Sequence, residues 1–188
     1  MRRALVLALV LSLAGCASKA VSGTSPSRPA GSAPSRASAP PTGSARGQTA
    51  PDFTLTSLDG ETVHLSALKG QPVFLDFWAT WCPPCRDSLP ETAKLSREYR
   101  DAGLKVYAVN VGEKPDIVAR YLAAAKIEVP VLLDIDEQAS KGYQFDGLPS
   151  FFVLDQDHVI QLRLTGWGSR GPGIIRQALK AMGVEPKS

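Results

Sequence analysis

The sequence predicts one α/β domain over residues 50–188, built from a mixed sheet with helices on both faces. Segments with the pattern of strands alternate with segments of helical pattern over residues 73–125, as in parallel sheets joined by helical crossovers. Two further strand-like segments flank a polar turn at residues 155–158, which predicts an antiparallel hairpin, and a last helix follows. The length of this region suits one domain, and no internal repeat is visible.

An apolar strand followed by two cysteines is the most informative stretch. Residues 73–78 form an almost continuous run of β-forming apolar side chains, which predicts a central strand covered on both faces. Cys82 follows where the strand gives way to a helix, and Pro83 takes the first helical position, where a missing N–H costs no hydrogen bond. The positive end of the helix dipole stabilises a thiolate at Cys82. Cys85 lies one turn further along, close enough to Cys82 for a disulfide.

The other elements are predicted in order along the chain. Alternating residues across an Asp-Gly turn predict an N-terminal hairpin, and prolines mark the starts of two later helices. Trp167, in a glycine-rich loop, either borders the site or packs against the core. The expected elements are strands at residues 52–56 and 62–65, a helical turn at 66–69, a helix at 83–102, a strand at 104–111, a helix at 115–125, a strand at 129–133, a helix at 136–143, strands at 151–154 and 159–164, and a helix at 172–182.

A zinc site and a structural crosslink are weaker interpretations of the cysteine pair. Half of a structural zinc site has this spacing, but a full site needs two more ligands. The remaining cysteine is Cys16, and His64 and His158 do not form a ligand pair, so we expect no metal. A disulfide that closes so short a loop constrains the unfolded chain little and would be a poor structural crosslink. A redox-active dithiol, with no other cofactor, is therefore the favoured interpretation.

These features resemble a known family. The sequence Trp-Cys-Pro-Pro-Cys at residues 81–85, directly after a strand, resembles the thioredoxin active site, and Asp76 matches the buried aspartate of thioredoxins. Four segments look like parts of the TlpA/ResA-like extracytoplasmic thiol–disulfide oxidoreductases, namely residues 50–55, 58–61, 65–70 and, matching the cis-proline loop, 147–150. The resemblance covers residues 49–183. It implies a thioredoxin fold with an N-terminal β-hairpin extension and a central insertion.

The resemblance also implies roles for residues of the site. Cys82 would be the exposed nucleophile, Cys85 would resolve the mixed disulfide, and Asp76 would accept the Cys85 proton directly or through one water. Several members of the family carry a glutamate six residues after the first cysteine, where this chain has Ser88, which leaves Asp76 as the main candidate. A merely hydrogen-bonded strand residue is the alternative for Asp76. The expected substrate-binding residues are Trp81, Pro83, Pro84, Leu148 and Pro149, with a cis bond between the last two.

Residues 1–15 have the pattern of a secretory signal peptide. Arg2 and Arg3 precede an apolar run at residues 4–13 that is too short to span a bilayer comfortably. Residues 13–16, Leu-Ala-Gly-Cys, resemble a bacterial lipobox, which implies cleavage before Cys16 and a lipid on that cysteine. An ordinary signal with a chance cysteine is the alternative. Residues 16–49 are dominated by Ser, Pro, Ala, Gly and Thr, which predicts a disordered tether.

Charge and location follow from this division. No acidic residue precedes Asp52, so the leader and tether account for the net charge of +3, and we expect no nucleic-acid binding. The resemblances imply a protein of the cell envelope, anchored by its lipid and facing the periplasm. Ala17, after the lipidated cysteine, leaves outer-membrane sorting open.

The expected function is thiol–disulfide exchange in the reducing direction. Pro83 and Pro84 offer neither a charge nor a backbone N–H to the Cys82 thiolate, which favours a reductant over an oxidant. By the resemblance, the partners would be thiols and disulfides of exported proteins, as in cytochrome c or metal-centre maturation, and a membrane electron donor. The alternatives are a peroxiredoxin-like peroxidase, suggested by residues 50–55, and a non-catalytic lipoprotein that binds a partner.

Overall fold

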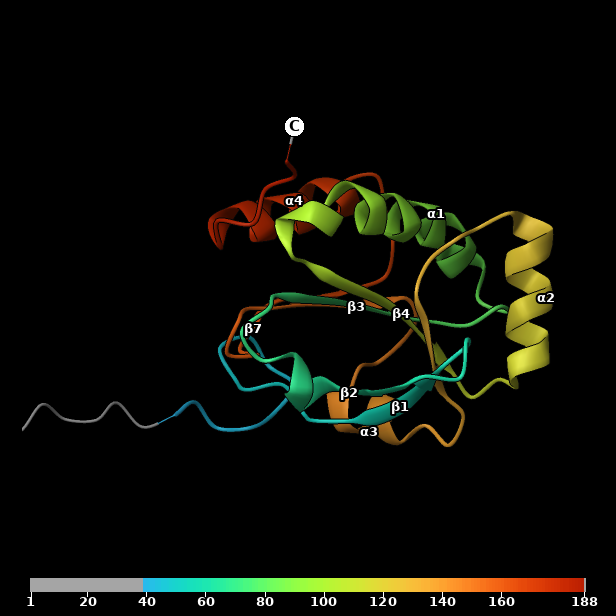
Figure 1. Cartoon of the computed structure of the whole chain (residues 1–188), viewed down its shortest axis with the longest axis horizontal. Helices are drawn as coiled ribbons and strands as arrows, with labels where there is room; N and C mark the ends of the chain where they lie inside the picture. Colours follow the sequence, from blue (N-terminus) through green and yellow to red (C-terminus); the bar gives the residue numbers. More distant parts are fainter. Residues whose placement is uncertain (1–38, 188) are drawn as a thin grey trace, which may run out of the picture. The chain divides into compact units, whose positions relative to one another are not determined.

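A seven-stranded mixed sheet forms the centre of the computed structural model, which describes residues 39–187 (Figure 1). The strand order is β2-β1-β5-β4-β3-β6-β7; β3, β4 and β5 are parallel, and the remaining pairs are antiparallel. The strands are β1 (Thr54–Ser57), β2 (Thr62–His64), β3 (Val73–Trp78), β4 (Lys105–Val111), β5 (Val131–Asp134), β6 (Ser150–Leu154) and β7 (Ile160–Thr165). The helices are η1 (Leu65–Leu68), α1 (Pro83–Glu98), η2 (Arg100–Ala102), α2 (Pro115–Ala125), α3 (Gln138–Tyr143) and α4 (Gly171–Ala181).

The central strand β3 has helices on both of its faces, and every one of its residues is buried. Successive side chains of a strand point to opposite faces. Leu75 and Phe77 therefore pack in the cluster that includes residues of α3, whereas Phe74 and Trp78 pack with residues of α1, α2 and α4. Figure 1 shows α1 and α4 on one face of the sheet and α3 on the other. The predicted α/β fold class, with a central strand covered on both faces, is confirmed.

The central insertion contributes to the core through Tyr143, the last residue of α3. Its ring centroid lies 5.0 Å from that of Phe77 and 4.8 Å from that of Phe152. Tyr143 is completely buried in this aromatic cluster. The short helix α3 is thus fixed to the sheet by one large side chain, although its six residues could not form a stable isolated helix.

Most predicted elements differ from the observed ones by one or two residues at an end, and two of the differences have a clear structural cause. The helix expected to reach residue 102 is divided: α1 ends at Glu98, η2 follows, and Gly103 adopts the left-handed conformation with φ of 79°. The first strand begins at Thr54 rather than at Asp52. The Asp52 carboxylate instead accepts hydrogen bonds from the backbone N–H groups of Phe53 (3.0 Å) and Ser66 (2.9 Å), which joins the strand to η1.

The segment before Ala50 is docked on the domain, although the sequence predicts a tether that extends to residue 49. The Gly47 N–H donates to the Ile160 carbonyl (2.8 Å), and the Ile160 N–H donates to the Gln48 carbonyl (2.9 Å). Arg163 donates from its guanidinium to the Ser44 carbonyl (3.3 Å) and hydroxyl (3.2 Å). Backbone pairing and one arginine therefore order a segment whose composition predicts disorder.

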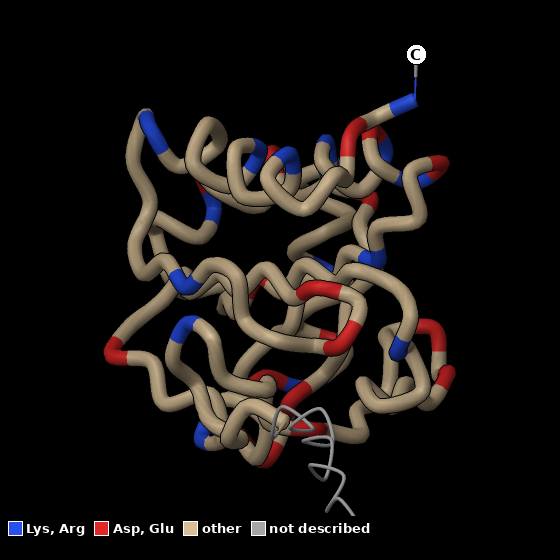
Figure 2. Tube along the Cα trace, turned by 90° about the vertical axis from the view of Figure 1, so that its left-hand side faces the viewer, with Lys and Arg blue, Asp and Glu red and all other residues tan. Residues whose placement is uncertain are grey.

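The predicted signal peptide, Cys16 and most of the predicted tether lie outside the described residues. Within residues 39–187, no helix is long and apolar enough to cross a membrane. Figure 2 shows Lys and Arg interspersed with Asp and Glu along the described chain, with no continuous basic stripe on the side in view.

Candidate active site

Cys82 and Cys85 form a disulfide at the start of α1, as the sequence predicts. Cys82 is the N-cap residue of this helix, and Pro83 follows at its first position. The two Cα atoms lie 5.3 Å apart and the sulfur atoms 2.12 Å apart. Strand β3 ends at Trp78, so only a short turn separates the central strand from the disulfide. No group of three or more His, Cys, Asp and Glu residues that could hold a metal ion occurs among the described residues.

The disulfide is more deeply covered than the sequence predicts. Cys82, expected to be exposed, retains only 3% of its accessible surface, and Cys85 retains none. Both belong to an apolar cluster with Trp78 and Leu89, against which Leu148 also packs. Cys82 remains the more accessible of the two cysteines, so the predicted order of accessibility holds.

The loop before β6 packs through Leu148 against the apolar cluster that contains the disulfide, and its Leu148-Pro149 peptide bond is cis, as predicted. Ser150, the first residue of β6, pairs with Phe77 near the end of β3. The Ser150 hydroxyl donates to the Gly147 carbonyl (2.7 Å), and the Gly166 N–H donates to the Pro149 carbonyl (2.8 Å). Neither of these bonds uses the backbone N–H or carbonyl of Leu148. The loop is therefore fixed on both sides of Leu148 without using its polar backbone groups.

An apolar surface surrounds the covered disulfide. Trp81 is 65% exposed, more than any other large apolar side chain in the described part of the chain. Pro83 and Pro84, between the cysteines, are also exposed. An exposed tryptophan next to the disulfide offers a rigid apolar contact for another molecule. The expected role of these three residues in substrate binding stays a prediction.

Asp76 is a completely buried carboxylate on β3. The Thr92 hydroxyl on α1 donates to its Oδ2 atom at 2.7 Å, whereas its Oδ1 atom has no hydrogen-bond partner. Burial raises the pKa of Asp76 from 3.8 to about 7, because a charge is poorly solvated there, and the Thr92 hydrogen bond partly opposes this increase. A carboxyl group with a pKa near neutrality can both accept and release a proton at physiological pH.

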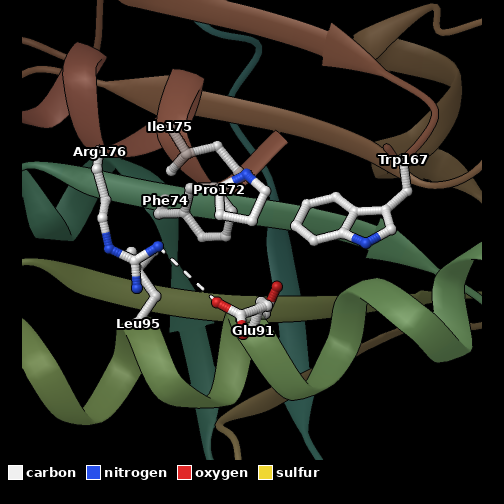
Figure 3. A pocket seen from close by; sticks show the side chains of 8 residues that line it. Phe74, Glu91, Leu95, Trp167, Pro172, Ile175 and Arg176 are labelled. Atoms are coloured by element: carbon white, nitrogen blue, oxygen red, sulfur yellow. Dashed lines mark ion pairs between the residues drawn. The ribbon is translucent and has the colours of Figure 1, made fainter. Parts of the chain in front are cut away.

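A narrow crevice between α1 and α4 is lined by Thr92, the hydrogen-bond partner of Asp76. Figure 3 shows Arg176 of α4 directed toward Glu91 of α1, with the Trp167 ring at the opposite side. The guanidinium of Arg176 lies 3.8 Å from the Glu91 carboxylate and 2.8 Å from that of Glu98. The crevice measures about 10 Å³, far below the size of an ordinary ligand pocket. Trp167 packs with its ring centroid 5.4 Å from that of Phe151, which agrees with the packing role that is one of its two predicted roles.

Sequence reasoning missed a hydrogen-bonded group next to the cysteines. The Glu113 carboxylate accepts hydrogen bonds from the Thr80 N–H (2.7 Å), the Thr80 hydroxyl (2.5 Å) and the Asn110 side-chain amide (2.8 Å). The parallel register pairs Trp78 with Asn110, so the segments after β3 and β4 meet at one edge of the sheet. The available signal was a carboxylate just beyond a buried parallel strand, at the edge where functional groups of α/β proteins gather.

Comparison with known proteins identifies the family. The model of the AhpC/TSA family matches residues 46–163. The thiol–disulfide oxidoreductase ResA of Bacillus subtilis is 36% identical over 120 residues, which cover 64% of this chain and 67% of the relative. ResA of Geobacillus kaustophilus is 37% identical over 120 residues, covering 64% and 69%. The chain belongs to the ResA-like thiol–disulfide oxidoreductases of the AhpC/TSA family.

A solved structure supports the same assignment for this ResA-like enzyme. A crystal structure from Chlorobium tepidum, provisionally described as the thiol:disulfide interchange protein DsbE, is 33% identical with a TM-score of 0.68. The match covers 73% of this chain and 97% of that one. The predicted family, thioredoxin-like fold and enzyme class are therefore confirmed, whereas the redox role of the Cys82–Cys85 disulfide stays a prediction.

Proposed function

We propose that this ResA-like enzyme reduces disulfides of exported proteins in the cell envelope, with Cys82 as nucleophile and Cys85 as resolving cysteine. The observation that carries the proposal is the placement of Cys82 as the N-cap of α1 with no side-chain cap hydrogen bond, followed by two prolines. The helix dipole supports a thiolate there, but neither proline adds a charge or an N–H donor. A reduced form with so little stabilisation is a good electron donor.

The proposed reaction conserves atoms and electrons in two steps. The Cys82 thiolate attacks one sulfur of the substrate disulfide, a mixed disulfide forms, and the other substrate sulfur leaves as a thiolate. Cys85 then attacks the Cys82 sulfur, the second substrate sulfur leaves, and the Cys82–Cys85 disulfide forms. Two electrons pass to the substrate. Asp76 is the proposed acceptor of the Cys85 proton, which its burial and near-neutral pKa support.

The proposed substrate is an extended segment of a protein that contains a disulfide. The backbone N–H and carbonyl of Leu148 have no hydrogen-bond partner within residues 39–187 and suit pairing with such a segment, and Trp81, Pro83 and Pro84 would contact its apolar side chains. Apocytochrome c or the metal-site cysteines of another exported protein are suitable substrates. A membrane electron donor would re-reduce Cys82 and Cys85, and a lipid on Cys16 would anchor the protein to the membrane.

Trapping with Cys85→Ser in the export compartment tests this function. This variant keeps the attacking sulfur but cannot release the mixed disulfide, so it should accumulate covalent complexes with its substrates, which mass spectrometry identifies. Cys82→Ser is the matched control and should capture nothing. Capture through Cys85 in the Cys82→Ser variant, in place of capture through Cys82, would contradict the assigned roles.

A further inference from the structure

The turn that carries the nucleophile is held by a carboxylate from a distant part of the sequence. Glu113 follows β4 and is 9% exposed, and its two oxygens accept three hydrogen bonds. A buried carboxylate is costly unless it is fully hydrogen-bonded, so these bonds are what allow Glu113 to occupy this position. Two of the three donors belong to Thr80, which lies two residues before Cys82.

Thr80 is fixed through all of its polar groups. Its N–H and hydroxyl donate to Glu113, and its carbonyl accepts a hydrogen bond from Arg86 Nε on α1 at 2.8 Å. The Cys82 N–H donates to the Ala79 carbonyl at 3.2 Å and closes the turn around Thr80. Hydrogen bonds to a charged group are stronger than those between neutral groups, so the bonds to Glu113 can order a short turn.

The disulfide also restrains this turn, but only in the oxidised protein. Once Cys82 and Cys85 are reduced, the covalent link between the turn and the first turn of α1 is lost. The hydrogen bonds of Thr80 do not involve sulfur and can persist through the redox cycle. They therefore restrain the turn at the stage where Cys82 has to meet a substrate disulfide.

We propose that Glu113 is a positioning residue for the nucleophile turn, which holds Thr80 so that Cys82 stays at the start of α1 and Trp81 stays directed outward. Glu113 acts through hydrogen bonds rather than through its charge, and it acts in either direction of electron flow. The role is separate from that of Asp76, which lies within β3 and bonds to Thr92.

The experiment compares Glu113→Ala with Glu113→Gln in the full chain. Glu113→Ala leaves the donors of Thr80 and Asn110 without an acceptor. Glu113→Gln keeps one carbonyl oxygen for the Thr80 N–H and Asn110, and the Thr80 hydroxyl can accept from the new amide. The rate of exchange between the reduced protein and glutathione disulfide is measured by acid quenching and mass spectrometry. We expect Glu113→Ala to react at least tenfold more slowly than wild type and Glu113→Gln to stay within about threefold of it.

Controls separate positioning from folding. Glu128→Gln changes an exposed carboxylate and should react like wild type. Thr80→Val removes only the hydroxyl and should slow exchange, whereas Thr80→Ser should not, which keeps the test available if Glu113→Ala does not fold. A Glu113→Gln rate as low as that of Glu113→Ala, or a Thr80→Val rate equal to wild type, would overturn the proposal.

Discussion

The buried carboxyl group of Asp76 should make the folded protein less stable as the pH rises, and Asp76→Asn should remove this dependence. The pKa of Asp76 is about 7 in the folded protein and 3.8 in its ordinary state. Between these values the unfolded chain has lost the proton, whereas the folded chain retains it. The unfolded state therefore binds fewer protons, and the free energy of unfolding falls as pH rises through this window.

The size of the effect follows from the two pKa values. A difference of about three pH units corresponds to about 4 kcal/mol of unfolding free energy at pH values above both. Asparagine keeps an oxygen acceptor for the Thr92 hydroxyl and cannot ionise. Relative to wild type, Asp76→Asn should gain up to about 4 kcal/mol in unfolding free energy between pH 4 and pH 8.

Urea unfolding of the oxidised proteins at a series of pH values measures this difference. The other carboxylates contribute equally to both proteins, so the difference between the two curves reports on Asp76 alone. Asp101→Asn, at an exposed aspartate of η2, is the matched control and should follow wild type at every pH. Parallel curves for wild type and Asp76→Asn would show that the Asp76 carboxyl titrates in its ordinary range, and the reasoning from burial would be wrong.

Three further predictions concern neighbouring features. Thr92→Val should raise the pKa of Asp76 by about one unit through loss of its hydrogen bond, measured by carbon-13 NMR titration, and Thr92→Ser should leave it unchanged. Gly171→Ala would bring a Cβ atom to 2.9 Å from the Trp167 ring and should lower the free energy of unfolding, measured with urea, by about 1–3 kcal/mol. Gly173→Ala, in the same helix, has open space around the new Cβ atom and should raise this free energy by about 0.4–1 kcal/mol. Equal effects of the two substitutions would contradict the packing of Trp167 against α4. The reduction potential, from equilibration with dithiothreitol buffers, should lie nearer the roughly −270 mV of thioredoxin than the roughly −120 mV of a strong oxidant, and a value near the latter would reverse the proposed direction.

Local sequence patterns were sufficient to predict the part of the site that is formed by consecutive residues. The apolar run of β3, the cysteine after it and the proline at the first helical position each act within a few residues. These features therefore predict the strand, the helix start and the disulfide. The cis bond before Pro149 could be predicted because residues 147–150 resemble the cis-proline loop of the family.

The remaining parts depend on contacts between distant segments. Thr80 and Glu113 are 33 residues apart in sequence, and only the parallel register of β3 and β4 brings them together. The apolar cluster that contains Cys82 likewise draws on distant segments, because Leu148 packs against it from the loop before β6. Composition could not show the docking of residues 43–49 either, because backbone groups make most of these contacts. Every residue except proline has a backbone N–H donor and a carbonyl acceptor, so these groups leave no signal in the composition.

The docked segment before Ala50 meets the sheet at the end opposite the disulfide. Residues 47 and 48 pair with Ile160, which lies beside Leu154 at the end of β6, and Leu154 pairs with Val73 at the start of β3. Cys82 follows the opposite end of β3, so the length of the central strand separates the attachment point from the disulfide (Figure 1). A force applied to the chain before residue 43 would therefore act on the strand ends opposite the disulfide. The end of the sheet next to Cys82 is thus the end that the docked segment leaves uncovered.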